Sequence, residues 1–184
     1  MKHFYVGATA DLRTDADREA VSLLRGRLAD EFGMRVRELE LPAIDFTFDA
    51  ARDQYASSAA LDRMARELPA DAAKLLAVTT RDLFIPVLTF VFGQAQLNGS
   101  AGIVSLARLR QEFYGLPADR SVFLDRAAKE ALHESGHLFG LIHCADRACA
   151  MSLSTGVRQI DLKQPAFCGH CRGRIHRPSR GGLQ

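Results

Sequence analysis

The sequence is short of several residue types that mark particular protein classes. It contains no tryptophan, three tyrosines and four lysines against 20 arginines, and its formal net charge is only +2. Because acidic side chains lie between the basic ones along the chain, no basic surface for nucleic acid is expected. No apolar run is long enough to span a bilayer, and the first three residues lead into an expected strand rather than a secretory signal. These absences predict a cytoplasmic protein without a membrane or nucleic-acid partner, and they leave its oligomeric state open.

Cysteine is equally scarce, and its four positions lie in one region: Cys144, Cys149, Cys168 and Cys171. Four residues separate the first two and two residues separate the last two, which is close to the two-pair spacing of structural zinc sites. Two disulfides are the alternative, and they would be more typical of a secreted chain. We predict a closed tetrahedral zinc site in which four thiolates bind the ion, although His170 could replace one cysteine as a ligand.

Histidines at the spacing of a hydrolytic zinc site precede these cysteines. His133 and His137 are four residues apart, so in a helix both imidazoles can reach one ion. Glu134 lies about 100° around the helix from His133 and borders the ion, where a general base for a zinc-bound water belongs. Gly140 can adopt the left-handed conformation that ends the helix, and His143 can then approach the ion from the other side. Three neutral imidazoles leave the fourth position to water, as in catalytic zinc sites.

The alternative for this histidine pair is that both are ordinary core or surface histidines. A His-Glu-x-x-His pattern arises by chance in roughly one chain of this size in a hundred, so it is weak by itself. The fixed offsets of Gly140 and His143 lower that chance about a thousandfold for an average composition. The combined pattern favours a metal site, and together with the cysteines it predicts two Zn²⁺ ions per chain, one catalytic and one structural.

The stretch from His133 to His143 resembles the extended zinc motif of the metzincin peptidases, and Met151 falls where those enzymes place the Met-turn beneath the metal. The four cysteines, which begin directly after the third histidine, are similar to those of the archaemetzincins in particular. The resemblance implies an α/β fold with a mixed, mostly parallel five-stranded twisted sheet and one antiparallel strand above the cleft. Several zinc peptidases of this clan carry a tyrosine just after the Met-turn, but all three tyrosines here precede the motif.

Apolar residues at helical or alternating spacing predict the elements of the first 80 residues. They are a strand over residues 3–6, a helix over 15–32, a strand over 35–41, a helix over 58–68 and a buried strand over 74–80. Thr14 or Asp15 can cap the first helix and Gly33 can end it. The first strand, helix and strand form a parallel crossover. His3 is expected at the surface and residues 49–55 in a loop.

Residues 89–95 and 101–106 are two apolar runs on either side of Asn98-Gly99, the dipeptide most typical of a tight hairpin. They are predicted to be antiparallel neighbours, preceded by a loop over residues 84–88 that Pro86 keeps out of the sheet. The free edge of the first strand could hold an extended peptide over zinc. An ordinary edge strand covered by a loop is the alternative.

The zinc motif lies at the end of a helix predicted over residues 121–139, with Ser121 or Asp125 as its cap and Lys129 in solvent. A single catalytic domain over 1–171 follows. Its N-terminal part, 1–140, contains the sheet and active-site helix, and its C-terminal part, 141–171, contains the third histidine, Met-turn and cysteine site. Residues 172–184 are basic and rich in glycine and proline, which predicts a flexible tail.

We interpret the protein as a zinc-dependent metalloprotease of peptide or protein substrates, with zinc at His133, His137 and His143 and with Glu134 as general base. Two alternatives stay open. The first is a zinc-stabilised binding module whose histidine site has lost its activity, although the retained Glu134 argues against it. The second is an amidase or another hydrolase that applies the same chemistry to a non-protein substrate.

Overall fold

The computed structural model describes residues 2–175 and contains a five-stranded sheet with the strand order β2-β1-β5-β8-β7. The first four strands of this order run parallel, and β7 pairs antiparallel with β8. The strands are β1 (His3–Thr9), β2 (Val36–Leu41), β5 (Ala72–Thr79), β7 (Gly93–Ala95) and β8 (Ala101–Ser105). The predicted mixed sheet with one antiparallel edge strand is therefore confirmed.

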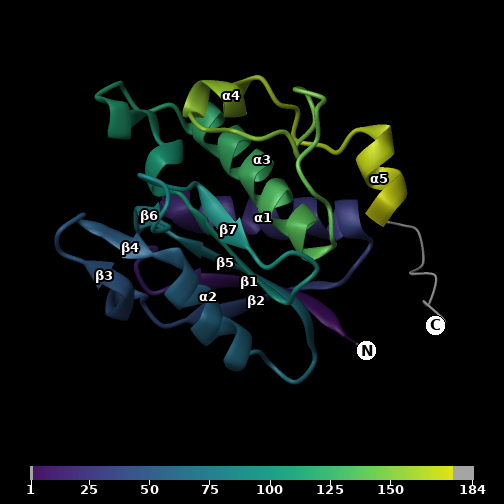
Figure 1. Ribbon diagram of the computed structural model, residues 1–184, viewed down its shortest axis with the longest axis horizontal. Coiled ribbons are helices and arrows are strands. Elements are labelled where there is room, and N and C mark those ends of the chain that lie inside the picture. Colours follow the sequence, from purple (N-terminus) through teal and green to yellow (C-terminus); the bar gives the residue numbers. More distant parts are fainter. Residues whose placement is uncertain (1, 176–184) are drawn as a thin grey trace.

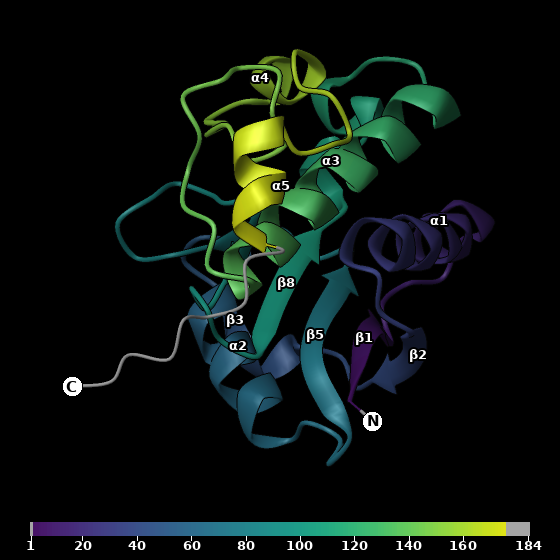
Figure 2. The ribbon, with the colours of Figure 1, turned by 90° about the vertical axis from the view of Figure 1, so that its right-hand side faces the viewer.

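Helices cover both faces of this sheet (Figures 1 and 2). Helices α1 (Asp15–Phe32) and α3 (Arg120–Leu138) share one face, and α2 (Ser57–Arg66) lies on the other. Alternate residues of the central strands face the two layers: Leu76 and Val78 of β5 pack with α1 and α3, whereas Leu75 and Ala77 pack with α2. The buried, apolar strands explain why sequence periodicity located them.

Helix ends follow the predicted chemistry with one exception. Thr14 caps α1, because its side chain accepts from the backbone of Asp17 while the Asp17 carboxylate accepts from the backbone of Thr14. Gly33 ends the helix with a φ of 60°. The prediction for α3 is wrong, since Asp119, not Ser121 or Asp125, accepts a hydrogen bond from the first turn.

A second, smaller sheet lies beside the main one, in the order β3-β4-β6. Its strands are β3 (Phe48–Asp49), β4 (Gln54–Ala56) and β6 (Leu83–Phe84). The loop predicted over residues 49–55 is thus partly a hairpin, whose turn includes Asp53 with a φ of 53°. Strands of two or three residues are too short for their periodicity to be read from sequence.

His3 is buried, with 5% of its surface exposed, which contradicts the expected surface position. Its Nε2 atom lies 3.8 Å from Asp71, in a group that also contains Tyr5 and Arg37. The imidazole is covered because β1 is an inner strand of the sheet. Burial is the largest influence on the pKa of His3 and lowers it below its usual value.

The C-terminal part contains two short helices, α4 (Val157–Asp161) and α5 (Gly169–Ile175); Figure 1 shows α4 above α3 and α5 to its right. Three 3₁₀ turns complete the fold: η1 (Asp45–Thr47), η2 (Ala107–Leu109) and η3 (Gln111–Tyr114). The predicted start of the flexible tail at residue 172 is wrong, because α5 continues to Ile175 and Arg172 pairs with Glu31 of α1. The rest of the predicted tail, residues 176–184, lies outside the described residues. Within the described residues, no helix is long and apolar enough to cross a membrane.

Candidate active site

The structure brings His133, His137 and His143 together at the end of α3. The Nε2 atoms of His133 and His137 are 3.2 Å apart, and one nitrogen from each of the three rings lies within 4.8 Å of the others. Two nitrogens bound to one tetrahedral zinc at about 2.0–2.1 Å are about 3.3 Å apart, so this spacing matches that of two ligands of one ion. The donor set and its geometry fit zinc.

Hydrogen bonds hold two of the rings in the orientation that metal binding requires. The Nδ1 atom of His133 lies 2.9 Å from the carbonyl oxygen of Ala150, and Nδ1 of His137 lies 2.7 Å from that of Leu141. Since a carbonyl only accepts, each Nδ1 carries the proton and each Nε2 keeps a free lone pair. Burial lowers the pKa of both histidines, and that of His133 well below 6.5, so the neutral, ligating form prevails.

The third histidine reaches the site through a glycine turn. Gly140 has a φ of 83°, and Leu141 donates back to the carbonyl of Gly136, which reverses the chain at the end of α3. Cys144 then donates to the carbonyl of Met151 at 2.9 Å, so the segment that carries His143 is fixed against the Met-turn. The predicted role of Gly140 in ending the helix is confirmed.

Met151 lies fully buried under the helix. A Cβ atom on Gly136 would overlap the Met151 sulfur, so the two segments touch where only a hydrogen atom fits. The neighbouring residue, Ala150, supplies the carbonyl that holds His133. Met151 is therefore packed directly against the helix that carries His133 and His137.

Glu134 projects toward the edge strand β7. A Cβ atom on Gly93 would lie 2.6 Å from Cγ of Glu134 and 2.7 Å from its Oε1, so the strand and the carboxylate approach as closely as a glycine allows. Among the described residues, no side chain or backbone group donates a hydrogen bond to Glu134. Burial raises its pKa well above the usual value, Glu130 adds to the shift and Lys163 opposes it.

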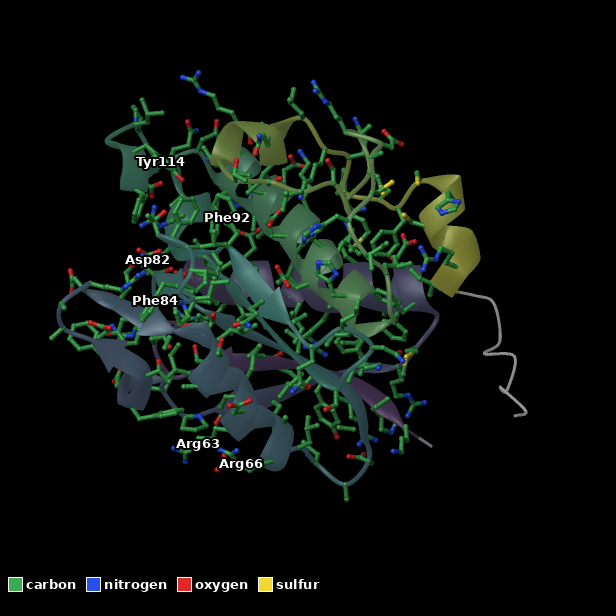
Figure 3. The ribbon with its side chains drawn as sticks, in the orientation of Figure 1. Arg63, Arg66, Asp82, Phe84, Phe92 and Tyr114 are labelled. Carbon is green, nitrogen blue, oxygen red and sulfur yellow. The ribbon has the colours of Figure 1, made fainter. Side chains whose placement is uncertain are left out.

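An open cleft of about 340 Å³ runs over these residues. Residues 88–95 form one wall and residues 153–155 the other, while Glu130, Glu134 and the three histidines form the floor. Figure 3 shows Phe92, which precedes β7, near α3 in this region, whereas Arg63 and Arg66 on α2 lie well away from it. The predicted edge strand therefore borders the cleft that contains the histidines.

The four cysteines form a second cluster beside the first. Their sulfur atoms lie within 4.8 Å of one another, with Cys144 and Cys168 at 3.9 Å, and all four are free thiols in this structure. Cys149 and Cys171 are buried, which raises the pKa of both thiols. His170 is exposed and is not part of the cluster. Four sulfurs converging on one point fit a closed tetrahedral zinc site.

Sequence reasoning missed a set of buried ion pairs along α3. Lys129, expected in solvent, is only 4% exposed and pairs with Asp125 at 2.5 Å. Lys163 pairs with Glu130 at 2.9 Å, and both side chains are almost fully buried. Glu130 lies one helical turn before Glu134, so the four-residue spacing of the two glutamates was a usable signal.

Residues 26–177 match peptidase family M54. The chain is 41% identical to the archaemetzincin of Methanocaldococcus jannaschii over 160 residues, which cover 85% of this chain and 86% of the relative. It is 39% identical to the archaemetzincin of Methanopyrus kandleri, with coverage of 83% and 82%.

Solved structures show the same fold. The crystal structure of archaemetzincin from Methanopyrus kandleri superposes with a TM-score of 0.82 at 32% identity and covers 95% of this chain and 93% of its own. That of a zinc-dependent peptidase from Methanocorpusculum labreanum gives 0.78 at 31% identity, with 94% and 100% coverage. Sequence and structure together confirm the resemblance seen in the zinc motif, and the chain belongs to peptidase family M54, the archaemetzincins, and is a zinc metallopeptidase.

Proposed function

We propose that the protein hydrolyses peptide bonds at zinc held by His133, His137 and His143, with Glu134 as the general base. One observation carries the proposal. A buried carboxylate without a hydrogen-bond partner among the described residues lies beside three convergent imidazoles, on the floor of an open cleft. Bound zinc supplies a Lewis acid that polarises the substrate carbonyl and makes water a stronger acid.

Glu134 performs the proton transfers in this mechanism. Its carboxylate accepts a proton from the attacking water as the oxygen adds to the carbonyl carbon, and it then gives that proton to the amide nitrogen as the C–N bond breaks. Burial favours the first step, because it makes the carboxylate more basic and removes competing hydrogen bonds. The raised pKa belongs to the protein without an ion, and a bound cation lowers it.

Strand β7 is the surface on which we place the peptide. It is the edge strand of the sheet, it borders the cleft, and its Gly93 lies directly opposite Glu134. An extended peptide added to this edge satisfies the open backbone groups of the strand and brings its carbonyl carbon over the histidines. A peptide or protein is therefore the proposed partner.

We further propose that the cysteine cluster holds a second, structural zinc. Four thiolates complete a tetrahedral shell, so such an ion has no open position for water. Its function follows from the chain, since Cys144 is joined directly to His143. The ion thereby fixes the segment that presents the third histidine, and residues 1–171 act as one catalytic unit. Because thiolate sites persist under reducing conditions, we place the protein in the cytoplasm.

The test is digestion of a diverse peptide library by zinc-loaded protein, with cleavage positions read by mass spectrometry. The Glu134→Ala variant serves as the control, and we expect it to retain both zinc ions and to lose about 10²–10⁴-fold in turnover. Metal content is measured on the same samples. Substantial residual turnover in this variant would refute the assignment of the base. If neither protein cuts any peptide although both contain zinc, the non-peptide hydrolase or the binding module is favoured.

A further inference from the structure

Glu130 is a second carboxylate on the floor of the cleft, which the proposed mechanism does not use. It lies one helical turn before Glu134 on α3, lines the cleft and is 3% exposed. Burying a carboxylate away from water is unfavourable unless partners compensate its charge and its hydrogen bonds. The partners of Glu130 therefore determine what the cleft offers to a substrate at this position.

Lys163 compensates the charge of Glu130. Its Nζ atom lies 2.9 Å from Oε1 of Glu130, and the two side chains are 1% and 4% exposed. The chain uses arginine for 20 of its 24 basic residues, yet lysine stands here. A compact ammonium fits a closed site that a planar guanidinium, with five donors to satisfy, would not. The pair is electrically neutral as a unit.

The second carboxylate oxygen of Glu130 is not satisfied. Among the described residues, Lys163 is the sole hydrogen-bond donor to Glu130, and it uses Oε1. This oxygen is not among the fully buried side-chain atoms that lack a partner in the described part of the chain, so it is open to the cleft. Because Glu130 lines the cleft, the group that completes its shell comes from the cleft, as water in the free protein or as part of a bound substrate.

The geometry places this oxygen beside one particular substrate residue. Along β7 and the segment around it, Asn98 contacts His137 and Gly93 faces Glu134, so the chain before Gly93 runs back along α3 toward Glu130. Phe92, the residue before Gly93, lines the cleft and lies near α3 (Figure 3). A peptide that lies along β7 with its scissile bond at Glu134 therefore directs an adjacent side chain toward Glu130.

We propose that Glu130, held by Lys163, determines substrate specificity by selecting a neutral, hydrogen-bond-donating side chain at one position next to the scissile bond. This inference rests on the proposed peptidase function and names its substrate class. A carboxamide, as in glutamine or asparagine, donates to the free oxygen of Glu130. An acidic side chain lacks a donor for the free oxygen of Glu130. A basic side chain loses its hydration without gaining a counter-ion, since Lys163 already neutralises Glu130.

The first experiment measures binding and does not depend on turnover. Two series of peptide hydroxamates bind to the zinc-loaded protein, one with the variable side chain before the zinc-binding group and one with it after. Each series carries glutamine, methionine or glutamate, which have similar length. In one of the two series we expect glutamine to bind about tenfold more tightly than methionine, and glutamate to bind most weakly. Equal affinities within both series would overturn the proposal.

Two variants test whether Glu130 causes this order. In Glu130→Gln, the new carboxamide accepts a hydrogen bond from Lys163 through its oxygen and turns its NH₂ group to the cleft. The affinity for the glutamate ligand should therefore rise relative to that for the glutamine ligand. In the double variant Glu130→Leu/Lys163→Met, the pair is replaced without leaving a lone buried charge, and the methionine ligand should bind best. An order that stays the same in both variants, with both zinc ions present, would assign the preference to another residue.

Cleavage of the peptide library separates this inference from the proposed function. If the unmodified protein cuts peptides with a glutamine or asparagine preference on the side that the hydroxamates identify, both stand. If it cuts peptides without such a preference, the specificity of Glu130 is wrong and the peptidase function stands. If the hydroxamate order appears but no peptide is cut, Glu130 selects the ligand as proposed and the substrate is not a peptide.

Discussion

The histidine cluster and the cysteine cluster are adjacent in the chain but differ in what surrounds them. The histidines lie on the floor of an open cleft, and a bound zinc there would keep its double positive charge, because imidazoles are neutral. In the proposed cysteine site, four thiolates would enclose the ion and make the net charge of the site negative. The histidine site leaves room for a substrate and would attract its carbonyl oxygen. The cysteine site has no room for a substrate and would not attract that oxygen.

The origin of the ligands differs as well. His133 and His137 come from α3, a 19-residue helix with a buried face, and only His143 depends on a loop. All four cysteines come from loops and from the seven-residue helix α5. The histidine site is therefore largely prepared by the core of the protein, while the cysteine segment depends on its own ligands for order.

The largest effect that distinguishes the two clusters is expected from removing one ligand of each. Cys168→Ser should lower the free energy of unfolding by about 3 kcal/mol or more and should reduce turnover, because the segment that carries His143 loses its anchor. His137→Ala should abolish turnover. Its thermal unfolding should stay close to that of the unmodified protein without zinc in the histidine site. Calorimetry and zinc analysis on both variants check this contrast.

His170→Ala is the matched control for the cysteine variant, because His170 lies beside Cys171 but outside the cluster. It should leave stability, zinc content and turnover unchanged. The coupling between the two clusters is wrong if Cys168→Ser melts and turns over like the unmodified protein.

A smaller effect is expected from filling the space between β7 and Glu134. In Gly93→Ala the new methyl group meets the Glu134 side chain and the backbone carbonyl of Ile103, so the base and strand β7 shift apart and turnover should fall about 10- to 100-fold with both zinc ions retained. Gly26→Ala in α1 is the control, since a Cβ there meets no atom within 4 Å and should stabilise the helix slightly. Equal turnover in the two variants would show that Glu134 does not need its position against the strand.

The smallest effect concerns pH and the metal-free protein. Burial holds the folded-state pKa of His133 well below the value near 6.5 expected in the unfolded chain, so the unfolded chain binds more protons between these two values. The contribution of His133 to stability is fully present above pH 6.5 and is lost as the pH falls toward its folded pKa. Cys149 and Cys171, whose pKa values burial raises above 9, do not titrate in this range.

Urea unfolding of the metal-free protein at pH 7.5 and pH 5 measures this dependence. We expect lower stability at pH 5, and a His133→Asn variant should show a smaller loss between the two values. An equally steep loss in that variant would assign the dependence to other groups.

Sequence reasoning predicted the parts of the fold that have long, regular signals. The apolar run of β5, the helical spacing in α1 and the Asn98-Gly99 turn each gave an element that the structure contains. The candidate zinc ligands could also be predicted from the sequence, because helix periodicity relates His133 to His137 and Gly140 indicates that the chain reverses toward His143. Both signals are local in the chain.

What the sequence could not predict depends on tertiary contacts. Lys129 and His3 look like surface residues because they are polar, and only the packing around α3 and β1 buries them. Lys163 follows Glu130 by 33 residues, so no local pattern connects the buried pair at the cleft floor. The short strands β3, β4 and β6 exist through pairing with one another, and three residues have no periodicity to detect.

Asn98, at the turn between β7 and β8, donates its backbone N–H to the carbonyl of His137 at 2.8 Å. This bond joins the tip of the hairpin to the last turn of the helix that carries two of the histidines, at a carbonyl that also accepts from the backbone N–H of Gly140. The hydrogen bond therefore fixes the distance between the β7–β8 hairpin, at the upper rim of the cleft, and α3, at its floor. Adaptation to substrates of different thickness has to come from the opposite rim, residues 153–155, whose Leu153 is exposed.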